Sequence, residues 1–244
     1  MAEGFIDIHC HILPGIDDGP EDIEESLKMV RMAVDDGITH IFATPHIMDG
    51  AYDNHTEKII SSLNNFKKQV SVPIDILFGA DIRISPDILK RIENNEIPTL
   101  NGSGYLLLEL PHFVMPPHVD NLIFNLRQRK FIPIIAHPER YIYLMNDFAK
   151  LKALRDMGVL YQITAMSITG NLGRDIRKAS FSMIEKGLID LVASDAHDTR
   201  RRPPKLSKAY REVQREFGNG VSEKIFFTNQ KKILEEAKVT RGCR

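Results

Sequence analysis

The stretch that decides the fold is residues 5–20, FIDIHCHILPGIDDGP. It begins with Phe5–His9, a short and mostly apolar run that predicts a strand, and continues into a polar segment. In an extended chain, residues i and i+2 point the same way, so His9 and His11 can bind one cation together while Cys10 faces away from them. The acids that follow Pro20 begin a helix. The stretch therefore predicts a strand, a polar loop and the start of a helix.

The helix predicted after this loop has one apolar face. Its apolar residues recur at helical spacing, at Ile23, Leu27, Val30 and Val34. The helix ends at Asp36-Gly37, where glycine is the expected C-cap. A second strand, Thr39–Ala43, follows directly.

The order helix, glycine, strand recurs along the chain. Asp156-Met157-Gly158 precedes the apolar run Val159–Ile163, and Glu185-Lys186-Gly187 precedes Leu188–Ala193. The other predicted strands are Ile74–Phe78, Tyr105–Leu110 and Ile132–Ala136. Further helices are predicted near residues 54–69, 86–94, 117–129, 147–156, 173–186, 204–216 and 229–238, and a frayed tail over Val239–Arg244.

About seven strands that alternate with helices predict a parallel sheet. The strands are nearly continuous apolar runs, as expected when both faces of a sheet are buried. No linker or break in composition divides the chain, and 244 residues suit one large domain. The sequence therefore predicts a single α/β domain over residues 1–244, with a closed barrel favoured over an open sheet.

The bulk composition excludes some classes of protein. Lys plus Arg is 32 and Asp plus Glu is 33, so no basic excess indicates binding to nucleic acid or to anionic membranes. The two cysteines, Cys10 and Cys243, form no disulfide pattern, which favours a reducing compartment. We see no signal peptide and no apolar run of about 20 residues that would cross a bilayer. We therefore expect a cytoplasmic protein without membrane insertion.

Side chains able to bind metal follow the predicted strands. In parallel α/β folds the carboxyl ends of the strands gather at one face, so distant residues can converge on one pocket. Imidazole and carboxylate suit Mn, Fe and Zn, and several carboxylates in one pocket repel each other unless cations neutralise them. We therefore expect two or more divalent cations there. The candidate ligands are His9, His11, Asp18, His46, Asp81, Glu109, His137, Asp195 and His197.

Some neighbouring residues have two interpretations. Asp17 and Asp18 compete for one ligand position, and the other is expected to cap the following helix. Asp7 is either a partner of the metal ligands or a buried polar residue. We interpret four further histidines as structural or surface residues: His40, His55, His112 and His118.

Arginines near these strand ends indicate a phosphate site. Arg140 follows His137-Pro138, and Arg200-Arg201-Arg202 follows Asp195-Ala196-His197. A guanidinium group binds phosphate oxygens through two hydrogen bonds at once, so we predict phosphate clamps at Arg140 and at Arg202. The prolines that follow Arg202 fix its position.

The motifs of other phosphatase chemistries are missing from the sequence. Six residues after Cys10 stands Ile16 rather than the arginine of a cysteine-based phosphatase, and the chain has neither G-x-S-x-G nor a phosphate loop.

Taken together, these motifs resemble the PHP (polymerase and histidinol phosphatase) superfamily. More narrowly, the chain is similar to the manganese-dependent bacterial protein-tyrosine phosphatases of capsule and exopolysaccharide operons, from residue 5 to about residue 237. The motifs that carry the resemblance are residues 7–14 (DIHCHILP), 17–20 (DDGP), 43–46 (ATPH), 136–140 (AHPER) and 194–197 (SDAH).

The resemblance implies a distorted (β/α)7 TIM-like barrel with three metals at one mouth. His9, His11 and Asp195 match the ligands of one metal. Glu109 and His137 match those of a second, and Asp18, His46 and His197 those of a third. Arg140 and Arg202 match phosphate-binding arginines, and we place Asp18 and His197 with them as catalytic residues. Asp81 stands where the family usually has a bridging Glu, so its side chain is one methylene shorter.

The function implied is hydrolysis of phosphotyrosine on a bacterial tyrosine kinase by direct attack of a metal-bound hydroxide, which regulates capsule or exopolysaccharide synthesis. Mn²⁺ is the implied metal, and the ligands suit Fe and Zn as well. One alternative is a small-molecule phosphatase such as histidinol-phosphate phosphatase, for which Met48–His55 and Pro111–His118 are the candidate specificity segments. Another alternative is a metal-binding regulatory protein without turnover, a reading that rests on Asp81. The oligomeric state is left open.

Overall fold

The structure, a computed structural model, describes residues 4–48 and 50–242, and its strands pair in parallel in two sheets. The three-stranded sheet contains β1 (Phe5–Cys10), β2 (Ile38–Ala43) and β4 (Asp75–Phe78). The six-stranded sheet contains β3 (His46–Ile47), β5 (Asp81–Arg83), β6 (Tyr105–Glu109), β7 (Ile132–Ala136), β8 (Leu160–Thr164) and β9 (Leu191–Ala193).

The two sheets are parts of one curved wall. Thr44-Pro45 separates β2 from β3, and Gly79-Ala80 separates β4 from β5, so each pair is one strand with a break. A proline at such a break lacks the N–H that an uninterrupted ladder needs. At the other side, Asp195 N donates to His9 O at 2.8 Å, which joins β1 to the chain after β9. Seven strand segments thus follow each other around the wall, as the predicted seven-stranded parallel barrel requires.

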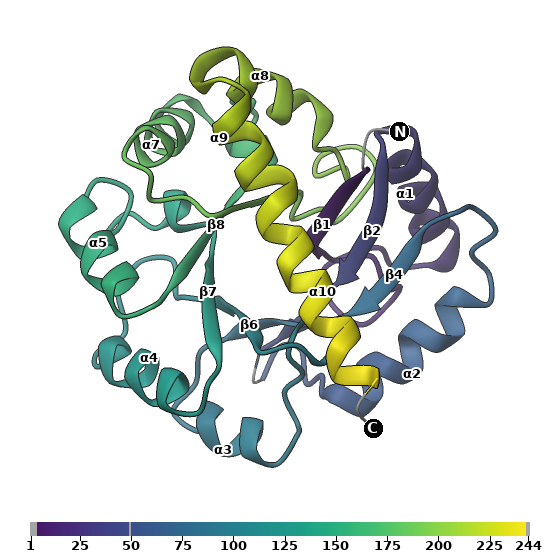
Figure 1. The fold of residues 1–244 in the computed structure, drawn as a ribbon. Helices are drawn as coiled ribbons and strands as arrows, with labels where there is room; N and C mark the ends of the chain where they lie inside the picture. The colour runs from purple at the N-terminus through teal and green to yellow at the C-terminus, as the bar shows by residue number, and fades with distance from the viewer. Residues whose placement is uncertain (1–3, 49, 243–244) are drawn as a thin grey trace.

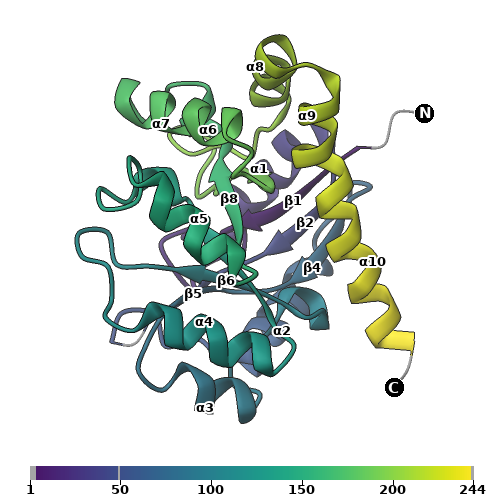
Figure 2. The ribbon, with the colours of Figure 1, turned by 60° about the vertical axis from the view of Figure 1, so that its left-hand side comes forward.

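Helices cover the outside and one end of this wall (Figures 1 and 2). The longer ones are α1 (Ile23–Asp35), α2 (Thr56–Lys67), α4 (Val119–Gln128), α5 (Phe148–Asp156), α7 (Arg174–Glu185), α8 (Ser207–Phe217) and α10 (Asn229–Gly242). The short ones are α3 (Ile88–Glu93), α6 (Ala165–Ile168), α9 (Asn219–Glu223), the 3-10 turns η1 (Leu100–Gly102) and η2 (Pro138–Arg140), and the π turn η3 (Lys224–Thr228).

Both faces of the strands are buried, as the continuous apolar runs predicted. In β6, Leu106 and Leu108 belong to an apolar cluster that includes residues of α1, α2 and α4, whereas Leu107 belongs to a second cluster. That second cluster also contains Ile233 and Leu234 of α10, the helix that crosses the barrel in Figure 1. With these side chains, α10 covers one end of the barrel. Each such buried side chain stabilises the fold by about 2 kcal/mol.

Two predictions about the chain's second half are wrong. Leu188–Asp190 is not a strand, and β9 begins only at Leu191. The Asp190 carboxylate, rather than a backbone carbonyl, accepts from Tyr161 N of β8 at 3.0 Å, and it also pairs with both terminal nitrogens of Arg155, at 2.6 and 2.7 Å. The tail expected from Val239 is helical as far as Gly242, and residues 243–244 lie outside the described residues. The short elements β3, β5, α6, α9, η1, η2 and η3 were not predicted, and the other bounds differ by a few residues at the ends of the elements.

Within the described residues, none of the helices combines the length and the apolar character that crossing a bilayer requires.

Candidate metal centre and phosphate site

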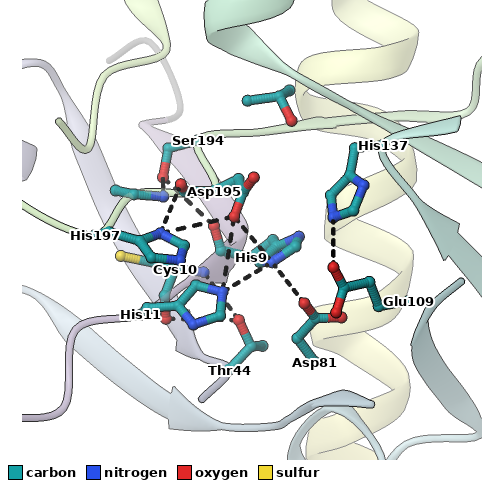
Figure 3. Close-up of polar contacts among 12 residues, drawn as sticks. His9, Cys10, His11, Thr44, Asp81, Glu109, His137, Ser194, Asp195 and His197 are labelled. Atoms are coloured by element: carbon teal, nitrogen blue, oxygen red, sulfur yellow. Dashed lines mark hydrogen bonds and ion pairs between the residues drawn. The ribbon is translucent and has the colours of Figure 1, made fainter. Parts of the chain in front are cut away.

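The predicted polar side chains converge at the carboxyl ends of the strands, and Figure 3 shows most of them. All nine candidate ligands are buried except Asp18, whose side chain is 42% exposed. They come from β1, β3, β5, β6 and the segments that follow β1, β7 and β9. All of them except His137 fall into three overlapping groups, each with a spacing that a cation could bridge.

The first group is His9, His11 and Asp195. The Nε2 atoms of the two histidines lie 3.1 Å apart, and Asp195 Oδ1 lies 3.3 Å from His9 Nε2 and 3.7 Å from His11 Nε2. Cys10 packs in the apolar cluster that includes residues of α1, α2 and α4. The predicted alternation of the His-Cys-His sequence is therefore confirmed, with both imidazoles on one side.

The second group is His46, Asp81 and Glu109. His46 Nδ1 lies 3.2 Å from Asp81 Oδ2 and 3.7 Å from Glu109 Oε2. His46 and Asp81 are direct neighbours in the register of β3 and β5, so the backbone brings the short Asp81 side chain within reach. Asp81 Oδ2 also lies 3.6 Å from His9 Nε2, so this carboxylate stands between the first and second groups. His137 Nε2 is 3.8 Å from Glu109 Oε1.

The third group is His11, Asp18, His46 and His197. Asp18 Oδ1 lies 3.3 Å from His197 Nε2 and 3.4 Å from His46 Nε2. Asp18, rather than Asp17, therefore faces this group. The expectation that the other aspartate caps the following helix is wrong, because Asp22 caps α1 by accepting from Glu25 N.

A second layer of side chains orients these imidazoles. Asp17 Oδ2 is 2.6 Å from His11 Nδ1, and the same carboxylate accepts from the backbone N–H groups of Gly19 and His46. Gln162 Oε1 lies 2.8 Å from His9 Nδ1. Such contacts fix a ring so that its other nitrogen faces a metal. Sequence analysis did not single out Gln162, because one glutamine inside an apolar strand carries no signal by itself.

Asp7 is a buried polar residue that acts on the backbone beside the site. Its carboxylate accepts from Ser194 N at 2.9 Å and from Ser194 Oγ at 2.5 Å. Burial raises the pKa of Asp7 to about 6, although both bonds from Ser194 oppose the shift. Because Ser194 directly precedes Asp195, Asp7 fixes the chain that carries one of the candidate ligands.

The residues present fit divalent cations. Several buried atoms of the site make no well-formed hydrogen bond among the described residues, although four of them lie within 4 Å of another polar atom of the site: His46 Nδ1, both oxygens of Asp81, Glu109 Oε2, His137 Nδ1 and His197 Nε2. Burial and the charge of Asp81 raise the pKa of Glu109 to about 7, so these two acids repel each other in the absence of a counter-charge. Buried polar atoms are costly to leave unpaired, and cations would supply both partners and charge.

Both predicted phosphate arginines lie against one carboxylate. Asp195 Oδ2 is 2.7 Å from Arg140 Nη1 and 2.6 Å from Arg202 Nη2, while its Oδ1 faces the histidines. Burial alone would raise the pKa of Asp195, but His9 and the two arginines hold it well below its usual range. Asp195 therefore connects the candidate metal ligands with the two guanidinium groups.

Two further residues at the mouth were missed or misjudged. Arg83 was not singled out, although its Nη2 lies 3.2 Å from Glu109 Oε2 and its Nη1 donates to Leu110 O. His112, interpreted as structural or surface, lies 3.8 Å from Glu109 Oε1 and is at the site. The position of Arg83, two residues after Asp81 in a strand, was the available signal, since i and i+2 share a side.

The other three histidines are structural or on the surface: His40 pairs with Asp75, and His55 and His118 precede α2 and α4.

The backbone is strained at two of the candidate ligands. His137 has φ 36° and Asp195 has φ 53°, both in the left-handed region that non-glycine residues rarely adopt. Such conformations cost of order 1–3 kcal/mol and collect at functional sites, where surrounding contacts hold them.

These features define the class of the protein: an α/β barrel with a metal-dependent centre for phosphate esters at the carboxyl ends of its strands. A model of the capsular polysaccharide synthesis family CpsB/CapC matches residues 5–235. The chain belongs to this family, as the resemblance implied.

Named relatives agree with this assignment. The tyrosine-protein phosphatase YwqE of Bacillus subtilis (strain 168) is 35% identical over 218 residues, which cover 88% of this chain and 86% of YwqE. The tyrosine-protein phosphatase CpsB of Streptococcus pneumoniae is 32% identical over 238 residues, which cover 94% of this chain and 98% of CpsB.

Solved structures share this fold. A crystal structure from a study of YwqE and CpsB, described there as unique metal-dependent tyrosine phosphatases, superposes with a TM-score of 0.87 at 33% identity and covers 96% of this chain and 93% of its own. The phosphotriesterase homology protein from Escherichia coli shares the fold, with a TM-score of 0.57 at 8% identity, and covers 96% and 99%.

Proposed function

We propose that this enzyme removes phosphate from phosphotyrosine on a bacterial tyrosine kinase, in the cytoplasm, with Mn²⁺ as its natural metal. Family membership and the named relatives already make the chain a metal-dependent tyrosine phosphatase. The kinase, the metal and the role of each residue are the proposed part. One observation carries it: three overlapping groups of imidazole and carboxylate meet beside two arginines at Asp195.

The proposed ligand sets draw on the three groups and add His137, whose Nε2 lies 3.8 Å from Glu109 Oε1. His9, His11 and Asp195 would hold one metal. Asp18, His46 and His197 would hold another, and Glu109 with His137 a third, with Asp81 placed to bridge. Imidazole and carboxylate suit Mn²⁺, and they suit Fe and Zn as well. When bound, such cations lower the pKa of water from about 15.7 toward 7 and offset charge on phosphoryl oxygens.

The protein's own side chains bind and orient the phosphate. Arg140 and Arg202 present guanidinium groups to the phosphoryl oxygens, which can accept two parallel hydrogen bonds from each. Asp195 holds both groups in place before substrate arrives, so little reorganisation is needed. A phenolate leaves readily, because the parent pKa of tyrosine is near 10, so the reaction demands little help from a general acid.

Exposed apolar side chains beside the site favour a protein substrate over a metabolite. The Pro111–His118 segment reaches the site at His112, and its next residues, Phe113 and Val114, are 82% and 70% exposed. Tyr143 Oη donates to Pro111 O at 2.6 Å, which fixes the start of this segment. Exposed apolar side chains beside a catalytic mouth suit contact with a polypeptide that flanks a phosphotyrosine.

The experiment compares a phosphotyrosine peptide with histidinol phosphate as substrates of the purified enzyme, with added Mn²⁺, Fe²⁺ or Zn²⁺ and with EDTA. We expect hydrolysis of the peptide to be preferred, highest with Mn²⁺ and lost in EDTA, while thiol alkylation leaves it intact because Cys10 is buried. Preference for histidinol phosphate would reject the protein substrate. Activity that survives EDTA but not alkylation would reject the metal mechanism.

A further inference from the structure

Residues 198–202, here named the clamp loop, form a closed turn that ends at Arg202. The Asp198 Oδ1 atom accepts from the backbone N–H groups of Arg200 at 2.6 Å, Arg201 at 2.5 Å and Arg202 at 3.2 Å. His197 N donates to Arg202 O at 2.9 Å, so the two ends of the loop meet. The turn thereby links the backbone of a candidate ligand, His197, to that of a phosphate arginine.

A single side chain from another element ties down the middle of the clamp loop. Glu25 Oε1, in the first turn of α1, accepts from Thr199 N at 3.1 Å and from Thr199 Oγ1 at 2.6 Å. These bonds connect residues 174 positions apart in the sequence. Glu25 lies outside the three groups of candidate metal ligands and the two arginines, so the proposed function gives it no task.

We propose that Glu25 is a positioning residue for phosphate binding, which acts by holding Thr199 so that the clamp loop presents Arg202 to the substrate. This inference rests on the proposed role of Arg202. A guanidinium group binds phosphate well only when its plane is already oriented, and an arginine side chain loses much rotamer freedom on binding. The guanidinium group of Arg202 contacts Asp195, and the backbone N–H of Arg202 donates to Asp198. Movement of the clamp loop as a whole is then the remaining way in which Arg202 could shift.

The helix supplies a matched control at the preceding position. Glu24 is exposed and also lies in the first turn of α1, so it has the same favourable interaction with the positive end of the helix as Glu25. Within the described residues, Glu24 makes no hydrogen bond or ion pair with the clamp loop. Glu24→Ala therefore removes the same charge from the same turn without releasing Thr199.

The test uses the full-length, Mn²⁺-loaded enzyme with Glu25→Ala, Glu25→Gln, Thr199→Val and Glu24→Ala. We expect Glu25→Ala to raise KM for a phosphotyrosine peptide and Kd for inorganic phosphate, measured by calorimetry, about three- to tenfold, the size of one or two hydrogen bonds. Thr199→Val, which keeps the shape and loses the hydroxyl, should change both constants in the same direction. Glu25→Gln, which keeps an acceptor oxygen, should restore most of the binding. The value of kcat should stay within about twofold, and bound metal and Glu24→Ala should match the wild type.

Two outcomes would overturn the inference. One is a Glu25→Ala enzyme whose phosphate affinity equals that of Glu24→Ala. The other is full additivity with Arg202→Ala, since a residue that acts through Arg202 should have little further effect once Arg202 is gone. Failure of the proposed function has a different signature. In that case wild-type enzyme would not turn over the peptide, or Arg202→Ala would leave phosphate affinity unchanged.

Discussion

His11 and Asp17 form a 2.6 Å contact in which the carboxylate Oδ2 meets the imidazole Nδ1, while the other nitrogen of the ring faces His9 and Asp195. Gly19 closes the loop onto this pair by donating its N–H to Asp17 Oδ1. A Cβ at Gly19 would come within 2.5 Å of His11 O, so only glycine fits there. The Asp-Asp-Gly motif therefore has two tasks, one acid orienting a ligand and the next facing the site.

Replacing Asp17 should weaken metal binding although Asp17 is not placed as a ligand. In Asp17→Asn the amide can still bond His11 Nδ1, but the charge that makes the ring a better donor is lost. We expect metal affinity to fall about 10- to 100-fold. Titration with Mn²⁺ measures this, with Asp120→Asn on exposed α4 as the control. An unchanged Mn²⁺ affinity would contradict the role assigned to Asp17.

Replacing Arg202 should act on the substrate rather than on the metal. Arg202→Ala removes one of the two guanidinium groups that contact Asp195 and leaves Arg140 in place. We expect kcat/KM for a phosphotyrosine peptide to fall about 100-fold, as when one donor to a developing oxyanion is lost. Arg201→Ala, one position earlier and exposed, is the matched control. If both variants behave alike, the effect belongs to the loop and not to the guanidinium group.

Several features of the fold and the site could be predicted because local pattern determines them. Apolar runs and glycine-ended helices specified the parallel strands, and polar residues at strand ends specified the ligand groups. The pairing of Asp190 with Arg155 could not be predicted from the sequence, because only the fold brings these two residues together. The same holds for His112, whose distance from Glu109 depends on the course of the loop after β6.

The resemblance implies a Glu at position 81, so Asp81 tests whether local geometry compensates for a side chain that is one methylene shorter. The β3–β5 register sets Asp81 opposite His46, and its Oδ2 stands 3.2 Å from His46 Nδ1 and 3.6 Å from His9 Nε2. We therefore expect Asp81→Glu to change metal stoichiometry and kcat by no more than about twofold, and Asp81→Ala to lose metal and most activity. Metal content by elemental analysis and kcat decide it. A gain of tenfold or more in Asp81→Glu would show that Asp81 holds the site short of its full activity.

Phe113 should matter for proteins and not for small substrates. Its side chain is 82% exposed, one residue from His112 at the mouth. We expect Phe113→Ser to raise KM for a phosphotyrosine peptide several-fold, because the peptide loses an apolar contact. Hydrolysis of p-nitrophenyl phosphate should stay at the wild-type rate, and Phe124→Ser, exposed on α4, serves as the control. Equal losses on both substrates would place the effect in the catalytic centre.

Removing the metal should destabilise the fold, because the site is built from groups that repel each other. Asp81 and Glu109 are buried together, and burial with the charge of Asp81 raises the pKa of Glu109 to about 7. A cation that binds only the folded state at 100 times its Kd adds about 2.7 kcal/mol to the free energy of unfolding. For a chain of this length that corresponds to a change in Tm of about 5–10 °C. Calorimetric scans with Mn²⁺ and with EDTA measure it. A His9→Ala/His11→Ala double variant should lose most of the difference in Tm between the two scans. A wild-type Tm that is the same with Mn²⁺ and with EDTA would mean that the protein's own groups neutralise the buried acids.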